Sequence, residues 1–320
     1  MSDSAPASIR IGISACLLGE KVRYDGGHKR DNYLVETFGR YVEWVPVCPE
    51  VEMGLGTPRE TLRLVRIGND VHMVMPKTGA DHTDGMRAYA ARRVRELVRE
   101  ELRGYILKKD SPSCGMERVR VFDAHGVPSK SGRGLFAEAL LQHFPHLPVE
   151  EEGRLCDARL RENFIERVFA YERLRLLFTP HWSIAGLVAF HTAHKLLLMA
   201  HSPLFYKSLG RLVAEAKSVP RTNLRDQYES EFMGALREMA TTKRHVNVLQ
   251  HMAGYFSKQL DPASRQELQS VIQDFHWGFV PLVVPLTLIN HYVRKYDVEY
   301  LRGQVYLEPH PKELMLRNHV

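Results

Sequence analysis

The stretch KKDSPSCG, Lys108–Gly115, decides the fold of the first half of this 320-residue chain. It follows the short apolar run Gly104–Leu107, which predicts a buried strand. Pro112 predicts that the strand has ended, because proline has no N–H for a strand ladder. Two hydroxyls and one thiol then follow the strand at once, so the stretch predicts a functional loop at the strand's carboxyl end.

Two other predicted strands also end on a cysteine. They are IRIGISAC, Ile9–Cys16, and YVEWVPVC, Tyr41–Cys48. Three strand ends with one thiol each suggest a shared site, formed by Cys16, Cys48 and Cys114.

The rest of the first half alternates predicted strands and helices. Helices are expected over 32–40, 84–104 and 135–144, a hairpin over 62–67 and 70–75, and a further strand over 119–122. Short strands that alternate with helices predict an α/β domain with a Rossmann-like, mostly parallel sheet. Ligands of such sheets bind outside the carboxyl ends of the strands, which is where the three cysteines stand.

The pattern changes after the acidic, turn-forming segment 146–153, so we expect one domain over 1–150 and a second, all-helical domain over 151–320. Proline and glycine separate the predicted helices of the second half, and Asp261 followed by Pro262 is typical of a helix start. The helices are expected over 158–177, 183–200, 202–217, 223–241, 244–260, 262–275 and 280–296.

Composition places the chain among ordinary globular proteins, with 44% hydrophobic and 26% charged residues. No apolar run reaches the roughly 18 residues that span a bilayer, and the N-terminus lacks the apolar core of a secretory signal. A cytoplasmic location is therefore expected. The net charge of +6 permits a polyanionic partner without demanding one.

The spacing of the cysteines restricts their chemistry. No C-x-x-C pair is present, whereas structural zinc sites usually contain one, and nucleophilic catalysis needs one thiol rather than three. Three thiolates would leave one iron of a [4Fe–4S] cluster without a protein ligand, and that iron could act as a Lewis acid towards sulfur. Three buried, unreactive thiols are the alternative.

Each of the three strand ends also carries polar side chains that could serve a reaction. Glu50 follows Cys48 by two residues and could supply a carboxyl group for acid–base chemistry. Each such residue could equally be a turn former or a surface charge. The other candidates are the hydroxyls of Ser111 and Ser113, the carboxylate of Asp25, and the cations of Lys108 and Lys109.

The motifs SACLLG with VRYDG, VPVCPEVEMGL with TPRE, and KKDSPSCG resemble the bacterial thiouracil desulfurase family (TudS-type) over most of residues 9–145. The second half resembles the helical domain that is fused to that family. It does so through LRENFIERVFAYERL, FHTAHKLLLMAHS, HVNVLQHMAGYF and YLRGQVYLEPHPKELMLRNHV. The two-domain form looks like the bacterial tRNA 4-thiouridine desulfidases (RudS-type).

The resemblance implies that Cys16, Cys48 and Cys114 hold a [4Fe–4S] cluster with one iron free of protein ligands. It also implies that Glu50 and Ser111 support acid–base steps, with Ser113 as a second candidate for the hydroxyl. Cys156 belongs to none of these motifs, and we interpret it as a structural thiol.

The helix around FHTAHKLLLMAHS places His191, His194 and Lys195 on one face. These side chains could bind a metal, could pack at a helix–helix contact, or could contact RNA phosphates together with Tyr206, Lys207 and Arg211. A folded RNA substrate needs phosphate contacts for its positioning, whereas a free base does not.

Three functions remain open at this point. The first is desulfidation of 4-thiouridine in tRNA, in which C=S becomes C=O without net redox change and sulfide is released. The second is the same chemistry on free 2-thiouracil or another thiolated pyrimidine. The third is a non-enzymatic iron–sulfur sensor or RNA-binding module, which has no need of Glu50. The net positive charge and the presence of a fused helical domain favour the enzyme that acts on tRNA.

Overall fold

The computed structural model describes residues 9–320 and separates into two compact units, Met1–Cys156 and Asp157–Val320. The first unit contains a parallel sheet with helices, and the second is built from helices, so the predicted fold class is confirmed. The division falls after Cys156 rather than after residue 150, because the segment expected to be a boundary contributes a buried strand to the first unit.

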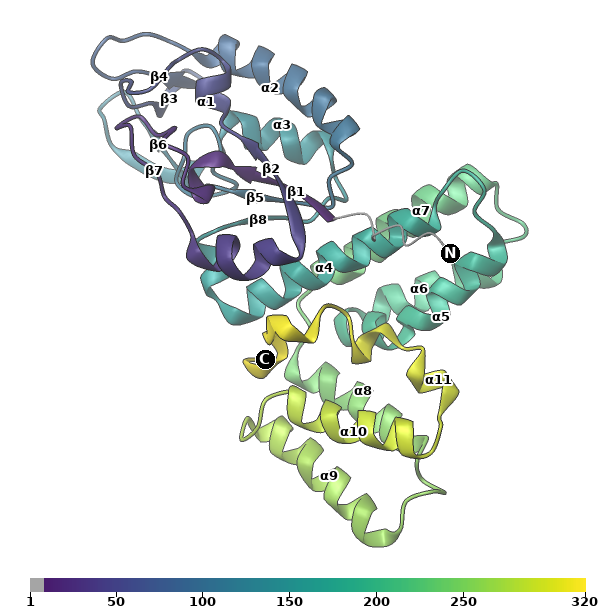
Figure 1. Ribbon diagram of the computed structural model, residues 1–320. Coiled ribbons are helices and arrows are strands. Elements are labelled where there is room, and N and C mark those ends of the chain that lie inside the picture. The colour runs from purple at the N-terminus through teal and green to yellow at the C-terminus, as the bar shows by residue number, and fades with distance from the viewer. Residues whose placement is uncertain (1–8) are drawn as a thin grey trace, which may run out of the picture. The chain divides into compact units, whose positions relative to one another are not determined.

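The first unit is organised around a four-stranded parallel sheet in the order β2-β1-β5-β8 (Figure 1). In its register Ser14 lies beside Val47, and Ile13 lies between Pro46 and Ile106. The carboxyl ends of β1, β2 and β5 therefore meet at one edge. The strands are β1 (Ile9–Ser14), β2 (Val42–Val47), β5 (Gly104–Leu107) and β8 (Val149–Glu151).

Close packing holds this sheet against the helices α2 (Thr83–Leu97) and α3 (Leu135–His143), which lie together on one of its faces (Figure 1). The ring of Phe136 on α3 contacts Tyr89 of α2 and Tyr105 of β5. Gly12 of β1 must lack a side chain, because a Cβ there would lie 2.2 Å from the Tyr105 ring. These contacts bury β1 and β5 almost completely.

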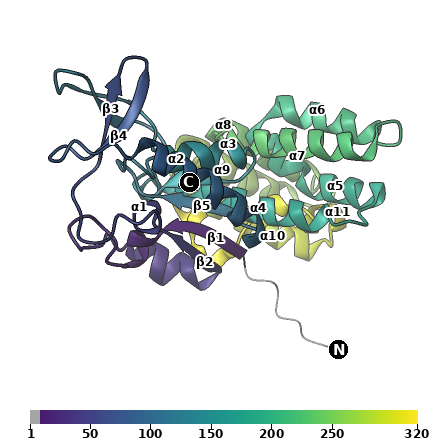
Figure 2. The same cartoon turned by 90° about the horizontal axis from the view of Figure 1, so that it is seen from above.

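A second four-stranded sheet has the order β4-β3-β6-β7, and its strands β3 and β4 lie apart from β1, β2 and β5 in Figure 2. The predicted hairpin is confirmed as the antiparallel pair β3 and β4. The separate sheet and its edge strand β7 were not predicted, because PSKSG is polar and exposed and so has no strand pattern. The strands are β3 (Arg63–Ile67), β4 (Asp70–Val74), β6 (Val119–Phe122) and β7 (Pro128–Gly132).

Two helices predicted in the first unit are shorter than expected. The segment 32–40 forms only a wide turn, Tyr33–Thr37, and a tight turn, Phe38–Arg40. The helix expected over 84–104 ends as α2 at Leu97, and one 3-10 turn, Val98–Glu100, leads to Glu101 in a left-handed conformation. That change of direction lets the chain enter β5.

Each helix predicted for the second unit is present, although those expected over 202–217, 223–241 and 244–260 end earlier, at Ala214, Arg237 and Gly254. Asp157 and Asp261 cap their helices by accepting backbone N–H groups, as the pattern at Asp261 predicted. Within this unit α4 to α7 pack on one another, as do α8 to α10 (Figure 1). The helices are α4 (Ala158–Leu177), α5 (Ile184–His201), α6 (Pro203–Ala214), α7 (Arg221–Arg237), α8 (Thr242–Gly254), α9 (Pro262–Trp277), α10 (Val283–Lys295) and α11 (Glu299–Arg302).

Over residues 9–320, none of the helices combines the length and the apolar character that a membrane crossing requires.

Candidate active site

A cavity of about 80 Å³ lies where β1, β2 and β5 end. Cys16, Cys48 and Cys114 all line it, and so do Glu50 and both candidate serines. The three strand ends that the sequence singled out are therefore brought to one place, and the parallel register of the sheet is the reason.

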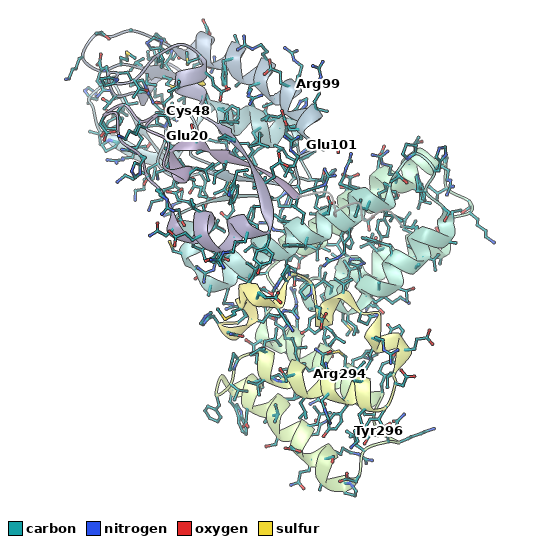
Figure 3. The ribbon with its side chains drawn as sticks, in the orientation of Figure 1. Glu20, Cys48, Arg99, Glu101, Arg294 and Tyr296 are labelled. Atoms are coloured by element: carbon teal, nitrogen blue, oxygen red, sulfur yellow. The ribbon has the colours of Figure 1, made fainter. Side chains whose placement is uncertain are left out.

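Local turns position the first two thiols. Cys16 lies in the 3-10 turn Ala15–Leu18, which Gly19 closes in a left-handed conformation that favours glycine. Cys48 stands at the N-cap of the short helix α1 (Pro49–Glu52), where β2 ends (Figure 3). The Glu52 carboxylate accepts the Cys48 backbone N–H at 3.0 Å and so fixes the start of that helix.

The third thiol is held by a turn that Ser111 forms. The Ser111 hydroxyl oxygen accepts the backbone N–H groups of Ser113 and Cys114, at 3.3 and 3.1 Å. Its carbonyl accepts the N–H of Gly115 at 2.8 Å. A Cβ on Gly115 would lie 2.8 Å from that carbonyl oxygen, so the glycine after Cys114 is a requirement of the turn.

Helix α3 supports the same loop from behind. The Ser113 carbonyl accepts the N–H groups of Phe136 and Ala137 at 3.0 and 3.1 Å, which places it against the first turn of α3. A Cβ on Gly134 would lie 2.4 Å from the Ser113 carbonyl oxygen. Gly134 therefore allows α3 to approach the loop closely.

Strand β8 fixes the other end of the loop. The Glu151 carboxylate accepts the N–H of Met116 at 2.7 Å, and the Glu152 carboxylate accepts the N–H of Lys109 at 2.7 Å. Glu152 also pairs with the Lys108 ammonium. The acidic segment that the sequence suggested as a domain boundary therefore anchors the loop that carries Cys114.

Burial governs the electrostatics of the three thiols. It raises the pKa of the Cys16 thiol to about 11, and it also raises the pKa of Cys48 and of Cys114. Negative charge on Cys16 and Cys48 raises the pKa of Cys114 further, so the three thiols interact electrostatically. Deprotonation of this group therefore needs a compensating positive charge in the cavity.

The residues present fit a cluster better than a single ion. In the part of the chain that the structure describes, no group of three or more His, Cys, Asp or Glu side chains is arranged to hold one metal ion. The thiols instead line a volume of about 80 Å³. Three thiols around one cavity fit a [4Fe–4S] cluster, because thiolate sulfur is its usual ligand.

Glu50 is held in this cavity by two partners, one on each carboxylate oxygen. Its Oε1 accepts the hydroxyl of Ser113 at 2.6 Å. Its Oε2 accepts Nε of Arg59 at 3.0 Å and a second bond from Nη2 of the same guanidinium. The Arg59 side chain is only 4% exposed, and its Nη1 donates to the carbonyls of Val22 and Gly56. The carboxylate is thus fixed in position and orientation.

The two candidate serines have different environments. Ser113 is 1% exposed and bonds directly to Glu50. Ser111 reaches Glu50 only through Ser113, because its hydroxyl lies 2.9 Å from the Ser113 hydroxyl. Since Ser113 donates to Glu50 and Ser111 Oγ already accepts two backbone N–H groups, the Ser111 hydroxyl donates to Ser113. The three groups form one directed chain, Ser111 to Ser113 to Glu50.

The remaining predicted substrate-binding residues divide into two groups. Lys108 lines the cavity, although Glu152 neutralises it. Lys109 and Asp25 are exposed and do not line it, and the backbone N–H of Gly27 lowers the pKa of Asp25. Substrate binding by Asp25, Lys108 and Lys109 stays a prediction. Cys156 is exposed and also lies outside it.

Sequence reasoning missed three polar or charged residues of the cavity, namely Ser14, Arg23 and Arg59. Ser14 accepts the N–H of Lys108 at 3.0 Å and is 2% exposed. Arg59 lies in the TPRE segment that carried part of the family resemblance, but the residue type alone gave it no role. Only the fold brings it to Glu50.

The histidines that we considered as RNA contacts in the helical unit are buried. His191 and His194 are each 2% exposed, and their Nδ1 atoms meet the Tyr228 hydroxyl at 3.2 Å and the Phe190 carbonyl at 2.7 Å. Burial lowers the pKa of His191 to about 4 and that of His194 to about 3, so both rings are neutral at pH 7. We correct the expectation: neither ring is placed to contact a phosphate.

The other four predicted RNA contacts remain accessible. Lys207 and Arg211 are exposed on α6, and Lys195 and Tyr206 are partly exposed. They stay candidates for RNA binding on that basis.

The model of the 2-thiouracil desulfurase family matches residues 11–152, and that of DUF1722, a family of unknown function, matches residues 195–311. The chain is 34% identical over 163 residues to the uncharacterized protein YbgA of Escherichia coli (strain K12), which covers 50% of this chain and 95% of YbgA. It is 31% identical over 110 residues to the uncharacterized protein YbbK of Bacillus subtilis (strain 168), over 33% of this chain and 72% of YbbK.

Among solved structures, the chain is similar to the [4Fe-4S]-dependent thiouracil desulfidase TudS. The identity is 33% and the TM-score 0.38, over 46% of this chain and 93% of that one. From the family models and the two curated relatives, we conclude that the chain belongs to the 2-thiouracil desulfurase family, in a form whose desulfurase domain is followed by a DUF1722 domain.

Proposed function

We propose that this protein is a [4Fe–4S]-dependent desulfidase that converts the C=S group of a thiolated pyrimidine into C=O, with 4-thiouridine in tRNA as its main substrate. The observation that carries the proposal is the cavity in which three thiols, Glu50 and Ser113 face one another. The overall change is R₂C=S + H₂O → R₂C=O + H₂S, which needs no oxidant or reductant.

Cys16, Cys48 and Cys114 would hold the cluster. When bound, such a cluster supplies an iron that has no protein ligand and acts as a Lewis acid with affinity for a soft sulfur atom. Three protein thiols around a site for a four-iron cluster support the idea that one iron stays open to the substrate.

Glu50 would be the general base. Arg59 holds its Oε2, so Oε1 is the oxygen available for proton transfer, and it faces the Ser113 hydroxyl. A water molecule in the cavity would lose its proton to Oε1 as its oxygen attacks the thiocarbonyl carbon. The protonated Glu50 would then return this proton to the departing sulfur through Ser113, whose hydroxyl would give its own proton to sulfur and take the one from Oε1, while Ser111 donates to the Ser113 oxygen and orients it.

The four free cysteines support the cytoplasm as the compartment, since the proposed ligands must stay reduced. The RNA part of the proposal is supported by Lys195, Tyr206, Lys207 and Arg211 in the helical unit, whose side chains are exposed or partly exposed. Free 2-thiouracil remains the alternative substrate, and a non-enzymatic sensor or RNA-binding module the third function, because the cavity alone does not select among them.

The test is anaerobic reconstitution with iron and sulfide, followed by parallel assays on 4-thiouridine-containing tRNA, the 4-thiouridine nucleoside and free 2-thiouracil. We expect sulfide release and loss of the thiocarbonyl absorbance, with the highest kcat/KM for tRNA. Turnover of the free base alone would refute the tRNA assignment. A reconstituted protein that releases no sulfide from any of the three substrates would refute the enzyme.

A further inference from the structure

A second cavity, of about 280 Å³, lies directly behind the catalytic loop. Asp110 and Pro112 line this cavity, whereas Ser111 and Ser113 line the first. A single segment of backbone thus separates the two cavities and presents alternate residues to them.

A second segment also contributes to both cavities. Arg59 lines the catalytic cavity, and Thr61 and Leu62 line the larger one. Because two independent segments form walls of both, the two cavities are neighbours within the desulfurase domain.

The larger cavity opens at the mixed sheet, where Arg63 of β3 and Arg120 and Phe122 of β6 line it. Leu64 pairs with Val121, and both are buried, so Arg63 and Arg120 project from the opposite face of neighbouring strands. In the register of β6 and β7, Arg120 lies opposite Lys130. Three cations therefore stand in a row across three strands.

Among residues 9–320, these cations have no carboxylate partner in an ion pair. Within the described residues, no ion pair involves Arg63, Arg120 or Lys130, and Arg120 and Lys130 are exposed. Asp110 is the carboxylate among the residues that line the cavity. The guanidinium of Arg63 lies over the Phe122 ring, 5.2 Å from its centroid.

We propose that this row of cations, with the Arg63–Phe122 pair, binds the nucleotides that flank the thiolated base of an RNA substrate. Unpaired cations along a strand face attract phosphates. Unstacked bases stack on arginine guanidinium planes and on aromatic rings. A polyanion made of stacking units matches this surface better than an acidic peptide, which would not use the Arg63–Phe122 pair. The inference rests on the proposed function, because the catalytic cavity must take the thiolated base itself.

The test uses the full-length protein and a fluorescein-labelled single-stranded pentaribonucleotide with one central 4-thiouridine. Its uridine counterpart serves for binding by anisotropy, which needs no turnover. The variant is Arg120→Glu with Lys130→Glu. Its matched control is Arg87→Glu with Arg95→Glu, because these two arginines are exposed on α2 of the same domain and the change in charge is equal. Phe122→Leu tests stacking while keeping an apolar side chain.

We expect the variant to bind the uridine oligomer about tenfold more weakly, and its salt dependence to fall by about one for each phosphate that the variant no longer binds. Its kcat/KM for the thiolated oligomer should fall in parallel, while kcat/KM for the 4-thiouridine nucleoside and the melting temperature stay unchanged. Phe122→Leu should weaken oligomer binding by about tenfold as well, with less effect on its salt dependence.

Three results would overturn the inference: no oligomer binding by the wild type, an equal loss in the α2 control, or an equal loss of turnover on nucleoside and oligomer. If oligomer binding depends on Arg120 and Lys130 while no substrate releases sulfide, the binding site stands and the proposed activity fails.

Discussion

The Ser113 hydroxyl donates a hydrogen bond of 2.6 Å to Oε1 of Glu50, and this bond joins the carboxyl ends of β5 and β2. The two residues are 63 positions apart in the chain. The bond separates the roles of the two serines of the SPSC motif, because Ser111 reaches Glu50 only through Ser113.

Ser113→Ala should lower kcat by about 10²–10⁴, the usual contribution of a positioned proton-transfer group. Ser111→Ala should lower it by about tenfold or less, because it removes one neutral hydrogen bond from the chain. Sulfide release by the reconstituted variants measures both, with iron content as the control for an intact cluster. The reverse order of the two effects would assign the catalytic hydroxyl to Ser111.

Arg59→Gln should lower kcat by about 10² with little change in KM, because Glu50 loses the partner that fixes its orientation. Arg59→Lys should recover only part of the activity, since an ammonium cannot form the two-pronged pair. Loss of a buried ion-pair partner also costs about 3–5 kcal/mol of stability, so thermal unfolding is measured in parallel. A fully active Arg59→Gln protein would show that Glu50 needs no such support.

Replacement of Cys16, Cys48 or Cys114 by serine should each remove the cluster and the activity, because every one of these thiols lines the cavity. Cys156→Ser should change neither, since Cys156 is exposed and lies outside it. Iron and acid-labile sulfide per chain after anaerobic reconstitution provide the measurement. Normal loading and turnover of a Cys16→Ser protein would contradict the assignment.

The helical unit should lose stability as the pH falls from 7 to 5. Burial lowers the pKa of His191 to about 4, and that of His194 and His245 to about 3, from 6.5. Below pH 6.5 the unfolded chain therefore binds protons that the folded chain excludes, and each histidine costs up to about 1.4 kcal/mol per pH unit. The stability that these neutral rings contribute is fully present above pH 6.5.

Thermal unfolding of the full chain between pH 5 and 8 measures this slope. His194→Asn should flatten it, while His291→Asn, an exposed position on α10, is the matched control. His201 has the opposite effect on the pH dependence of stability, because its pKa is raised rather than lowered. Burial disfavours its charge, but the bond to Glu166 at 2.5 Å raises its pKa, so its contribution is lost only as the pH rises through that raised value. A melting temperature that is constant from pH 7 to 5 would refute the argument.

Lys207→Glu with Arg211→Glu should weaken tRNA binding, and the salt dependence of binding should fall by about one for each phosphate that loses its cation. Lys243→Glu with Lys258→Glu, an equal charge change at exposed positions of the same unit, should have little effect. Filter binding at several salt concentrations measures both. Equal effects of the two variants would mean that α6 has no special role in RNA binding.

The sequence by itself determined the elements and the residue types of the site. Thiols at the ends of three apolar strand patterns predicted a shared centre, and a parallel sheet must bring neighbouring strand ends to one edge. Helical periodicity and capping likewise predicted α4 with its observed bounds and the start of α9 at Pro262. These features depend on local contacts, which a single stretch of sequence contains.

The tertiary structure alone decided which side chains meet. Arg59 pairs with Glu50, Ser113 rather than Ser111 bonds to it, and β8 anchors the loop that carries KKDSPSCG. It also buried His191 and His194, whereas helical spacing alone places them on one face without deciding whether that face is buried or exposed. Such contacts join residues far apart in the chain, and their geometry follows from strand order and close packing. No local pattern contains that information.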